Sequence, residues 1–148
     1  MVKHTYDYPR PAVTADIAIV TIEDRPRVLL IQRKHDPFAG CWALPGGFVD
    51  ANERLVDAAK RELKEETGVE DVEMEQLHAF GDPGRDPRGW TITIAYLARV
   101  RPDQVKPIAA DDAAAVAWFS VDELPKLAFD HTVILQRMKT RITDRSAS

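Results

Sequence analysis

The chain has 148 residues, a formal net charge of −4 and a single cysteine, Cys41. This length suits one domain over residues 1–148 that buries its own core without disulfides. The mild acidity and the dispersed basic residues lack the electrostatic footprint of a nucleic-acid-binding protein, and no apolar run reaches membrane-spanning length. We therefore expect a soluble, cytoplasmic protein with neither nucleic acid nor membrane among its partners.

The first part of the chain predicts two strands followed by a glycine turn. Residues 1–10 are predicted to be irregular, because their prolines disfavour helix. Residues 13–22 and 28–32 are apolar, β-rich runs separated by turn residues, which predicts a hairpin. Residues 33–40 form a polar loop whose cations are candidates to face phosphate, although a solvated loop is the commoner meaning of such a run. Residues 41–44 then lead into the turn.

The rest of the chain alternates between helix and strand patterns. A helix is predicted over residues 53–67, and a final helix over 132–142 with Asp130 or His131 near its N-terminal cap. Three more strands are predicted where apolar and β-branched residues alternate, over 72–80, 90–100 and 115–120. Residues 143–148 are predicted to be a disordered tail. This order predicts an α+β fold, a mixed β-sheet sandwiched between α-helices.

The predicted helix over 53–67 has an acidic edge that requires explanation. Glu62, Glu65 and Glu66 stand at i, i+3 and i+4, so their carboxylates project from one side. Like charges at this spacing repel, and more so where water is excluded. A divalent cation removes the repulsion, and hard carboxylate oxygens suit Mg²⁺ or Mn²⁺. Taken alone, however, three such acids are more often an ordinary solvated helix face.

The acids belong to a longer pattern, G-x5-E-x7-R-E-U-x-E-E-x-G-U with U an aliphatic residue, which runs from Gly47 to Val69. Its seven fixed positions would match by chance on the order of 10⁻⁸ per starting point. The pattern resembles the box of the Nudix hydrolases. The resemblance implies the Nudix fold and metal-dependent hydrolysis of a nucleoside diphosphate linked to another moiety.

The resemblance also implies roles for single residues of the pattern. The implied metal ligands are Gly46, through its carbonyl oxygen, and Glu62, Glu65 and Glu66. Arg61 is the implied orienting residue, and Gly47 and Glu53 support the box. Independently of the resemblance, a turn that contains Gly46 and Gly47 indicates either positive φ or a close backbone approach. Gly68 is interpreted as a helix stop in the left-handed conformation.

The general base is not settled by the pattern. Within the family it is either a glutamate of the box or an acid on a later loop, and the later loops here carry Asp82, Asp86, Asp111 and Asp112. Asp112 is preferred, because related ADP-ribose hydrolases carry an acidic base in that connection. An acidic pair such as Asp111 and Asp112 before a strand is equally often a solvated pair without a catalytic role. The implied catalytic residues are then Arg61, Glu62, Glu65 and Asp112.

The loop over residues 81–89 contains two prolines, which fix its charged side chains at low entropic cost. Together with the lead-in RKHDPFAGCWALPGGFVD, it resembles the ADP-ribose pyrophosphatase branch of the Nudix family and the related NAD-linked transcriptional regulators. This implies ADP-ribose as substrate, giving AMP and ribose 5-phosphate. Arg88 is the expected phosphate contact, with Asp86 beside it in the substrate site. Trp42 and Phe48 are the aromatic candidates for adenine and ribose.

Two other functions are consistent with these residues. A nucleoside triphosphate pyrophosphohydrolase would use the same box, which is indifferent to the group attached to the phosphates. An ADP-ribose-sensing regulatory domain without hydrolysis would need an appended DNA-binding module, and it need not retain the acids, all of which are present here. The oligomeric state does not follow from the residues, although homodimers are common in the resembled branch.

Overall fold

A computed structural model describes residues 3–110 and 113–144 of the chain. In these residues, seven strands form one mixed sheet and two helices cover it. The main path of the sheet runs β3 (Trp42–Ala43), β2 (Arg27–Arg33), β1 (Ala12–Thr21), β6 (Thr91–Val100) and β5 (Glu75–Phe80). Off this path, β4 (Gly46–Phe48) pairs with β1 and β7 (Ala113–Ser120) pairs with β2. The predicted α+β class, a mixed sheet with helices, is confirmed.

β1 is the centre of this sheet. It pairs in parallel with β6 along its whole length, from Ala12 opposite Thr91 to Thr21 opposite Val100. The hairpin predicted for the first two strands is present, because β1 and β2 pair antiparallel at Val20 and Val28. The two-residue β3 and three-residue β4 were not predicted, since runs this short carry no periodicity.

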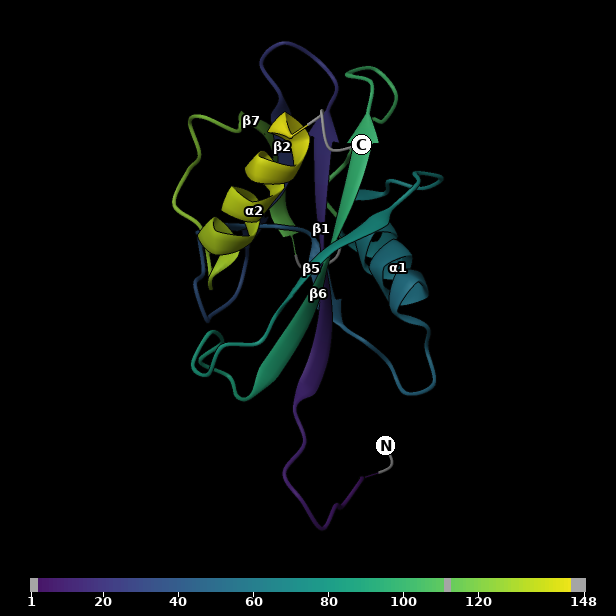
Figure 1. The fold of residues 1–148 in the computed structure, drawn as a ribbon, viewed down its shortest axis with the longest axis vertical. Helices are drawn as coiled ribbons and strands as arrows, with labels where there is room; N and C mark the ends of the chain where they lie inside the picture. The colour runs from purple at the N-terminus through teal and green to yellow at the C-terminus, as the bar shows by residue number, and fades with distance from the viewer. Residues whose placement is uncertain (1–2, 111–112, 145–148) are drawn as a thin grey trace.

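The two helices lie on opposite faces of the sheet, α1 (Leu55–Thr67) on one side of β1 and α2 (His131–Thr143) on the other (Figure 1). Successive side chains of a strand point to opposite faces, so β1 supplies both cores. Its residues Ala18 and Val20 belong to the core that contains the buried residues of α2, whereas Ile17 and Ile19 belong to the core that contains Leu63 of α1. This alternation fixes which side of β1 each helix occupies.

The first helix begins two residues later than predicted, so Glu53 precedes it. It ends as expected at Gly68, which has φ of 72° and donates its backbone N–H to the Lys64 carbonyl. The left-handed conformation favours glycine there because a Cβ would crowd the backbone. Among the residues that the structure describes, neither helix has the length and apolar character needed to cross a membrane.

Candidate active site

The site is built where the β4 turn lies against both β1 and α1. Gly46 pairs with Asp16 of β1, and Gly47 pairs with Ala15. A Cβ at Gly46 would collide with the Ala15 carbonyl oxygen, and a Cβ at Gly47 would lie 2.5 Å from the Glu62 carboxylate carbon. Of the two reasons offered for this glycine pair, close approach is therefore the correct one.

Arg61 organises the carboxylates on the outer side of α1. Its Nε and Nη2 donate to both carboxylate oxygens of Glu53, at 2.8 and 3.0 Å. Its Nη1 donates to Glu62 Oε1 at 2.8 Å and to Glu65 Oε2 at 3.3 Å, while Nη2 also reaches the Phe48 carbonyl at 3.0 Å. The contact with Glu53 is bidentate, and one guanidinium contacts three acids and the turn.

These contacts separate the pKa values of the acids. Hydrogen bonds from Arg61 hold the pKa of Glu53 at about 2, well below its ordinary value. Burial instead raises the pKa of Glu62, although Arg61 opposes the change. Glu66 is affected most: burial raises its pKa to about 8, and the nearby Glu62 and Asp16 carboxylates add to the effect. A buried acid beside two others is most stable next to a positive charge.

Glu66 also meets the glycine turn. The Gly46 backbone N–H donates to Glu66 Oε1 at 2.7 Å. The contact that Gly46 makes with the acids in this structure is therefore through its N–H. Among residues 3–110 and 113–144, no three acidic, histidine or cysteine side chains already form a group able to hold a metal ion. Glu62 and Glu65 are instead held by Arg61, whose guanidinium provides the cation for this acidic edge.

The donor set nevertheless suits a hard divalent ion. Carboxylate oxygens are the ligands that Mg²⁺ and Mn²⁺ prefer. Burial raises the pKa values of Glu62 and Glu66, so a cation bound beside them would stabilise their charged forms, and the missing Cβ of Gly47 lets the turn approach the Glu62 carboxylate. The residues therefore fit the ion that the acidic edge implies.

A buried polar network that was not predicted from the sequence supports the turn from the other side. Asp16 Oδ2 accepts a hydrogen bond from Thr93 Oγ1 at 2.6 Å, and its Oδ1 lies 3.8 Å from His131 Nε2. His131 Nδ1 accepts the Leu44 backbone N–H at 3.0 Å, and burial lowers the pKa of this imidazole. His131 is therefore neutral, with its proton on Nε2 facing Asp16. The available signal was an aspartate inside an apolar strand.

The loop over residues 81–89 places two arginines beside this network. Arg88 binds Asp86 with Nε and Nη2 at 2.8 to 3.2 Å. Burial would raise the pKa of Asp86, but the hydrogen bonds from Arg88 outweigh it and hold that pKa below its ordinary value. Arg85 makes a bidentate pair with Asp130, at 2.7 and 2.9 Å. Both arginines are thereby held by aspartates in fixed positions.

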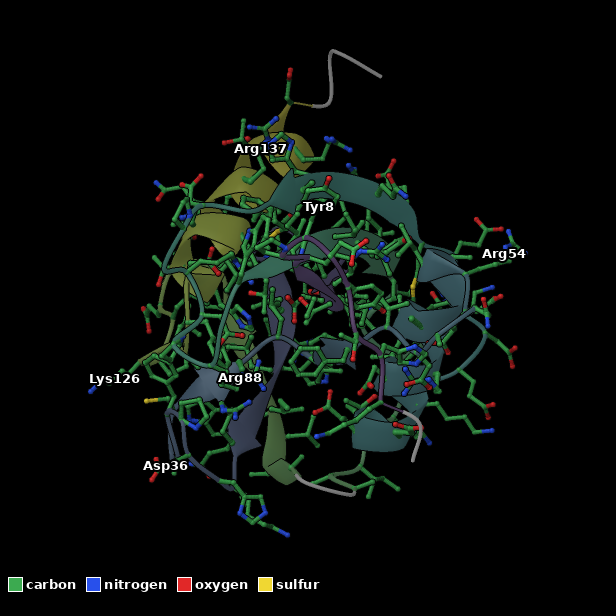
Figure 2. All side chains as sticks on the ribbon, turned by 90° about the horizontal axis from the view of Figure 1, so that it is seen from below. Tyr8, Asp36, Arg54, Arg88, Lys126 and Arg137 are labelled. Carbon is green, nitrogen blue, oxygen red and sulfur yellow. The ribbon has the colours of Figure 1, made fainter. Side chains whose placement is uncertain are left out.

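These groups surround a cavity of about 60 Å³. Residues from both faces of the sheet and from the loop line it, among them Asp16, Arg33, Gly47, Glu66, Arg88 and His131. In Figure 2, which views the molecule from below, Arg88 lies within the outline of the molecule, whereas Asp36, Arg54 and Lys126 project at its edge. The volume suits a phosphate group rather than a whole nucleotide.

The structure brings some of the predicted site residues together and leaves others apart. Asp86 and Arg88 line the cavity, and Phe48 lies against Arg88, with its ring centroid 4.9 Å from the guanidinium carbon. Trp42 does not line it, because its ring packs edge-on against Phe119 at 4.8 Å in the core beneath α2. Asp82 is exposed and borders a separate groove. Asp111 and Asp112, the latter the preferred base, lie outside the described residues.

The family follows from comparison with known proteins. The family model described as NUDIX domain matches residues 11–138, and the chain therefore belongs to the Nudix family. It is 44% identical to the ADP-ribose pyrophosphatase of Methanocaldococcus jannaschii, over 87% of this chain and 73% of that protein.

One further relative is a transcriptional repressor, and another is a solved NUDIX domain with a bound ligand. The chain is 36% identical to the ADPR responsive transcriptional repressor NtrR of Acinetobacter baylyi, over 95% of this chain, and it spans 58% of that repressor. The solved NUDIX domain of Shewanella oneidensis NrtR, complexed with ADP ribose, superposes with a TM-score of 0.83 at 34% identity. That match covers 93% of this chain and 94% of the solved domain.

The glycine pair gives a prediction about stability. Gly46→Ala should lower the free energy of unfolding by about 2 kcal/mol or more, because the new Cβ meets strand backbone that has no room to move. Gly47→Ala should cost less than about 1 kcal/mol, because the Cβ meets the movable end of the Glu62 side chain. Urea unfolding measures both, and equal losses for the two variants would contradict the assignment.

The Glu53–Arg61 contact gives a prediction about pH. The folded-state pKa of Glu53 is about 2, against an ordinary 4.5, so the contact stabilises the fold above about pH 4.5 and loses this effect as the pH falls. The difference in unfolding free energy between wild type and Glu53→Gln should therefore shrink between about pH 4.5 and about pH 3.

Urea titrations at several pH values measure this difference. The matched control is Glu70→Gln, whose exposed carboxylate pairs with Lys64 at 3.0 Å at the other end of α1. A difference for Glu53→Gln that does not vary with pH would show that the Arg61 contact contributes nothing to folding.

Proposed function

We propose that the chain hydrolyses the diphosphate bond of ADP-ribose with Mg²⁺ or Mn²⁺ as cofactor, giving AMP and ribose 5-phosphate. The observation that carries the proposal is an arginine-lined cavity of phosphate size at the Gly46–Gly47 turn, which Glu66 of the box lines and beside which the Glu62 carboxylate lies against Gly47. The 44% identity to an ADP-ribose pyrophosphatase supports this choice of substrate. A small-molecule nucleotide of this class is then the partner of the site, and a homodimer is the proposed assembly.

Glu62, Glu65 and Glu66 would hold the metal, with the Gly46 carbonyl as a further proposed ligand. When bound, such an ion neutralises diphosphate oxygens and lowers the pKa of an attacking water. Arg61 holds Glu62 and Glu65 on the correct side of α1. Gly47 and Glu53 act through these contacts, the first by leaving room for Glu62 and the second by fixing Arg61.

The arginines of the cavity supply the remaining positive charge. Arg33, Arg85 and Arg88 all line it, and guanidinium groups stabilise the charge of a phosphoryl group during displacement. Arg85 and Arg88 are prearranged by their aspartate partners, so less ordering is required when an anion binds. Phe48, exposed beside Arg88, is the proposed aromatic contact of the nucleotide.

The proposed general base is Asp112, acting with Arg61, Glu62 and Glu65. Two competing acids are less suitable. Asp86 is hydrogen-bonded to Arg88 and has a lowered pKa, so it is a weak proton acceptor. Asp82 faces the separate groove. If Asp112 has no role in the reaction, the base is a glutamate of the box.

A second candidate function is ADP-ribose sensing without hydrolysis. It is favoured by the similarity to the solved NrtR domain with ADP ribose, which covers nearly all of this chain. In that case the same cavity would bind the ligand and release it unchanged. Turnover is the property that separates the two candidates.

A substrate panel tests the proposal. Purified protein with Mg²⁺ should release AMP from ADP-ribose with a higher kcat/KM than it shows for nucleoside triphosphates, NADH or diadenosine polyphosphates. A preference for nucleoside triphosphates would instead identify a nucleotide-pool pyrophosphohydrolase. Tight ADP-ribose binding without AMP release would identify the sensing domain.

The glutamates of the box give a matched set of variants. Glu65→Gln and Glu66→Gln should each lower kcat roughly a thousandfold, because the amide is a poor ligand for a hard cation. The unfolding midpoint should not fall, since neither side chain is part of the apolar core. Glu70→Gln is the control. Glu70 lies three residues beyond the end of α1 and pairs with Lys64, so this variant should keep the wild-type kcat. Near-normal turnover in Glu66→Gln would refute the metal assignment.

Asp112→Asn tests the base. We expect a loss of activity with unchanged Mn²⁺ affinity, because a base acts on water rather than on the metal. Single-turnover rates and Mn²⁺ titration measure the two effects separately. If the variant retains the wild-type rate, the role of base returns to Glu62 or Glu65.

A further inference from the structure

Rings and guanidinium groups alternate in a row beside the cavity. The guanidinium carbon of Arg88 lies 4.9 Å from the ring centroid of Phe48 and 5.0 Å from that of Phe129. The guanidinium carbon of Arg33 lies 4.9 Å from the same Phe129 centroid. The ring of Phe129 is therefore in contact with two guanidinium groups, and the order along the row is Phe48, Arg88, Phe129, Arg33.

The backbone of this aromatic residue is unusual. Phe129 has φ of 52°, in the left-handed region that bulky side chains rarely adopt. Its edge-on neighbour Phe38, at a centroid distance of 4.9 Å, has φ of 65°. Strained residues of this kind persist where surrounding contacts hold them, and they concentrate at functional sites. A bulky residue in this conformation at the edge of the cavity, in contact with two arginines, is therefore a candidate for a functional role.

Both arginines of the row face the proposed phosphate site. Arg33, Arg88 and Phe129 line the same cavity as Glu66 and Gly47. Each arginine also has a polar partner: Arg33 Nε donates to the Pro37 carbonyl at 2.7 Å, and Arg88 binds Asp86. These partners hold one part of each guanidinium, while the ring of Phe129 lies 4.9 and 5.0 Å from the two guanidinium carbons.

We propose that Phe129 is a positioning residue for anion binding: its ring holds Arg33 and Arg88 so that both guanidinium groups face the diphosphate of the substrate. The inference rests on the proposed function for the identity of the anion. Anion binding itself requires no turnover, so it can be measured separately from hydrolysis. Long arginine side chains lose much conformational freedom on binding, and a supporting ring removes part of that loss beforehand.

Replacement of the ring tests the proposal. Phe129→Leu keeps an apolar side chain but removes both cation–ring contacts, so the Kd for inorganic pyrophosphate in metal-free buffer should rise roughly tenfold. The KM for ADP-ribose should rise similarly, with little change in kcat. Phe129→Tyr retains the ring and should restore both values to within about twofold of wild type.

Two further variants separate positioning from stability. Phe119→Leu is the matched control, because Phe119 is also half-buried and paired edge-on with an aromatic ring but lies away from the cavity. It should lower the unfolding midpoint without changing the pyrophosphate Kd. Phe129→Gly removes the ring and also relieves the left-handed backbone strain. It should bind pyrophosphate as weakly as Phe129→Leu, which would show that the loss of the ring, and not backbone strain, weakens binding.

The outcomes are distinguishable from failure of the proposed function. A wild-type protein that binds no pyrophosphate, a Phe129→Leu variant with unchanged Kd and KM, or a Phe129→Tyr variant that fails to restore binding would each overturn the inference. Pyrophosphate binding that depends on the ring, in a protein that releases no AMP, would support this inference and contradict the proposed hydrolysis.

Discussion

The close approach of the β4 turn to two other elements is the constraint on which the site depends. Gly46 lies against the backbone of β1, and Gly47 lies against the carboxylate of Glu62 on α1. Because neither glycine has a side chain, the turn can lie close enough for the Gly46 N–H to reach Glu66 and for the Phe48 carbonyl to reach Arg61. The turn thereby contacts Glu66 directly and reaches Glu62 and Glu65 through Arg61.

Charge is arranged in fixed pairs around this turn. Arg61 holds acids on the outer side of α1, while Arg85 and Arg88 are each held by an aspartate at the cavity. In the Arg85 and Arg88 pairs one partner is almost fully buried, so desolvation offsets much of the attraction. Their value here is positional. They present cations beside the acids, so that guanidinium groups can bind phosphate oxygens next to the acids that would hold a divalent ion.

The second helix reaches the same turn from the opposite face of the sheet. His131, the first residue of α2, accepts the Leu44 N–H just before the glycines, and Asp16 of β1 lies beside it. Phe129, two residues earlier, contacts the arginines. The short segment that leads into α2 therefore links the core to the cavity, and a displacement of this helix would move both the turn and the arginine row.

Local patterns in the amino-acid sequence were enough to predict the acidic edge, because Glu62, Glu65 and Glu66 lie on one helix and their geometry follows from local spacing. They also predicted the main strands, whose alternation records which face is buried. The remaining features depend on contacts between distant parts of the chain. The Thr93–Asp16 and Leu44–His131 hydrogen bonds join residues 77 and 87 positions apart, and no local pattern encodes such pairs. For the same reason the sequence predicts Trp42 at the substrate although it lies in the core, and no sequence pattern indicates Phe129. Neighbours in space, rather than in sequence, decide what an aromatic ring contacts.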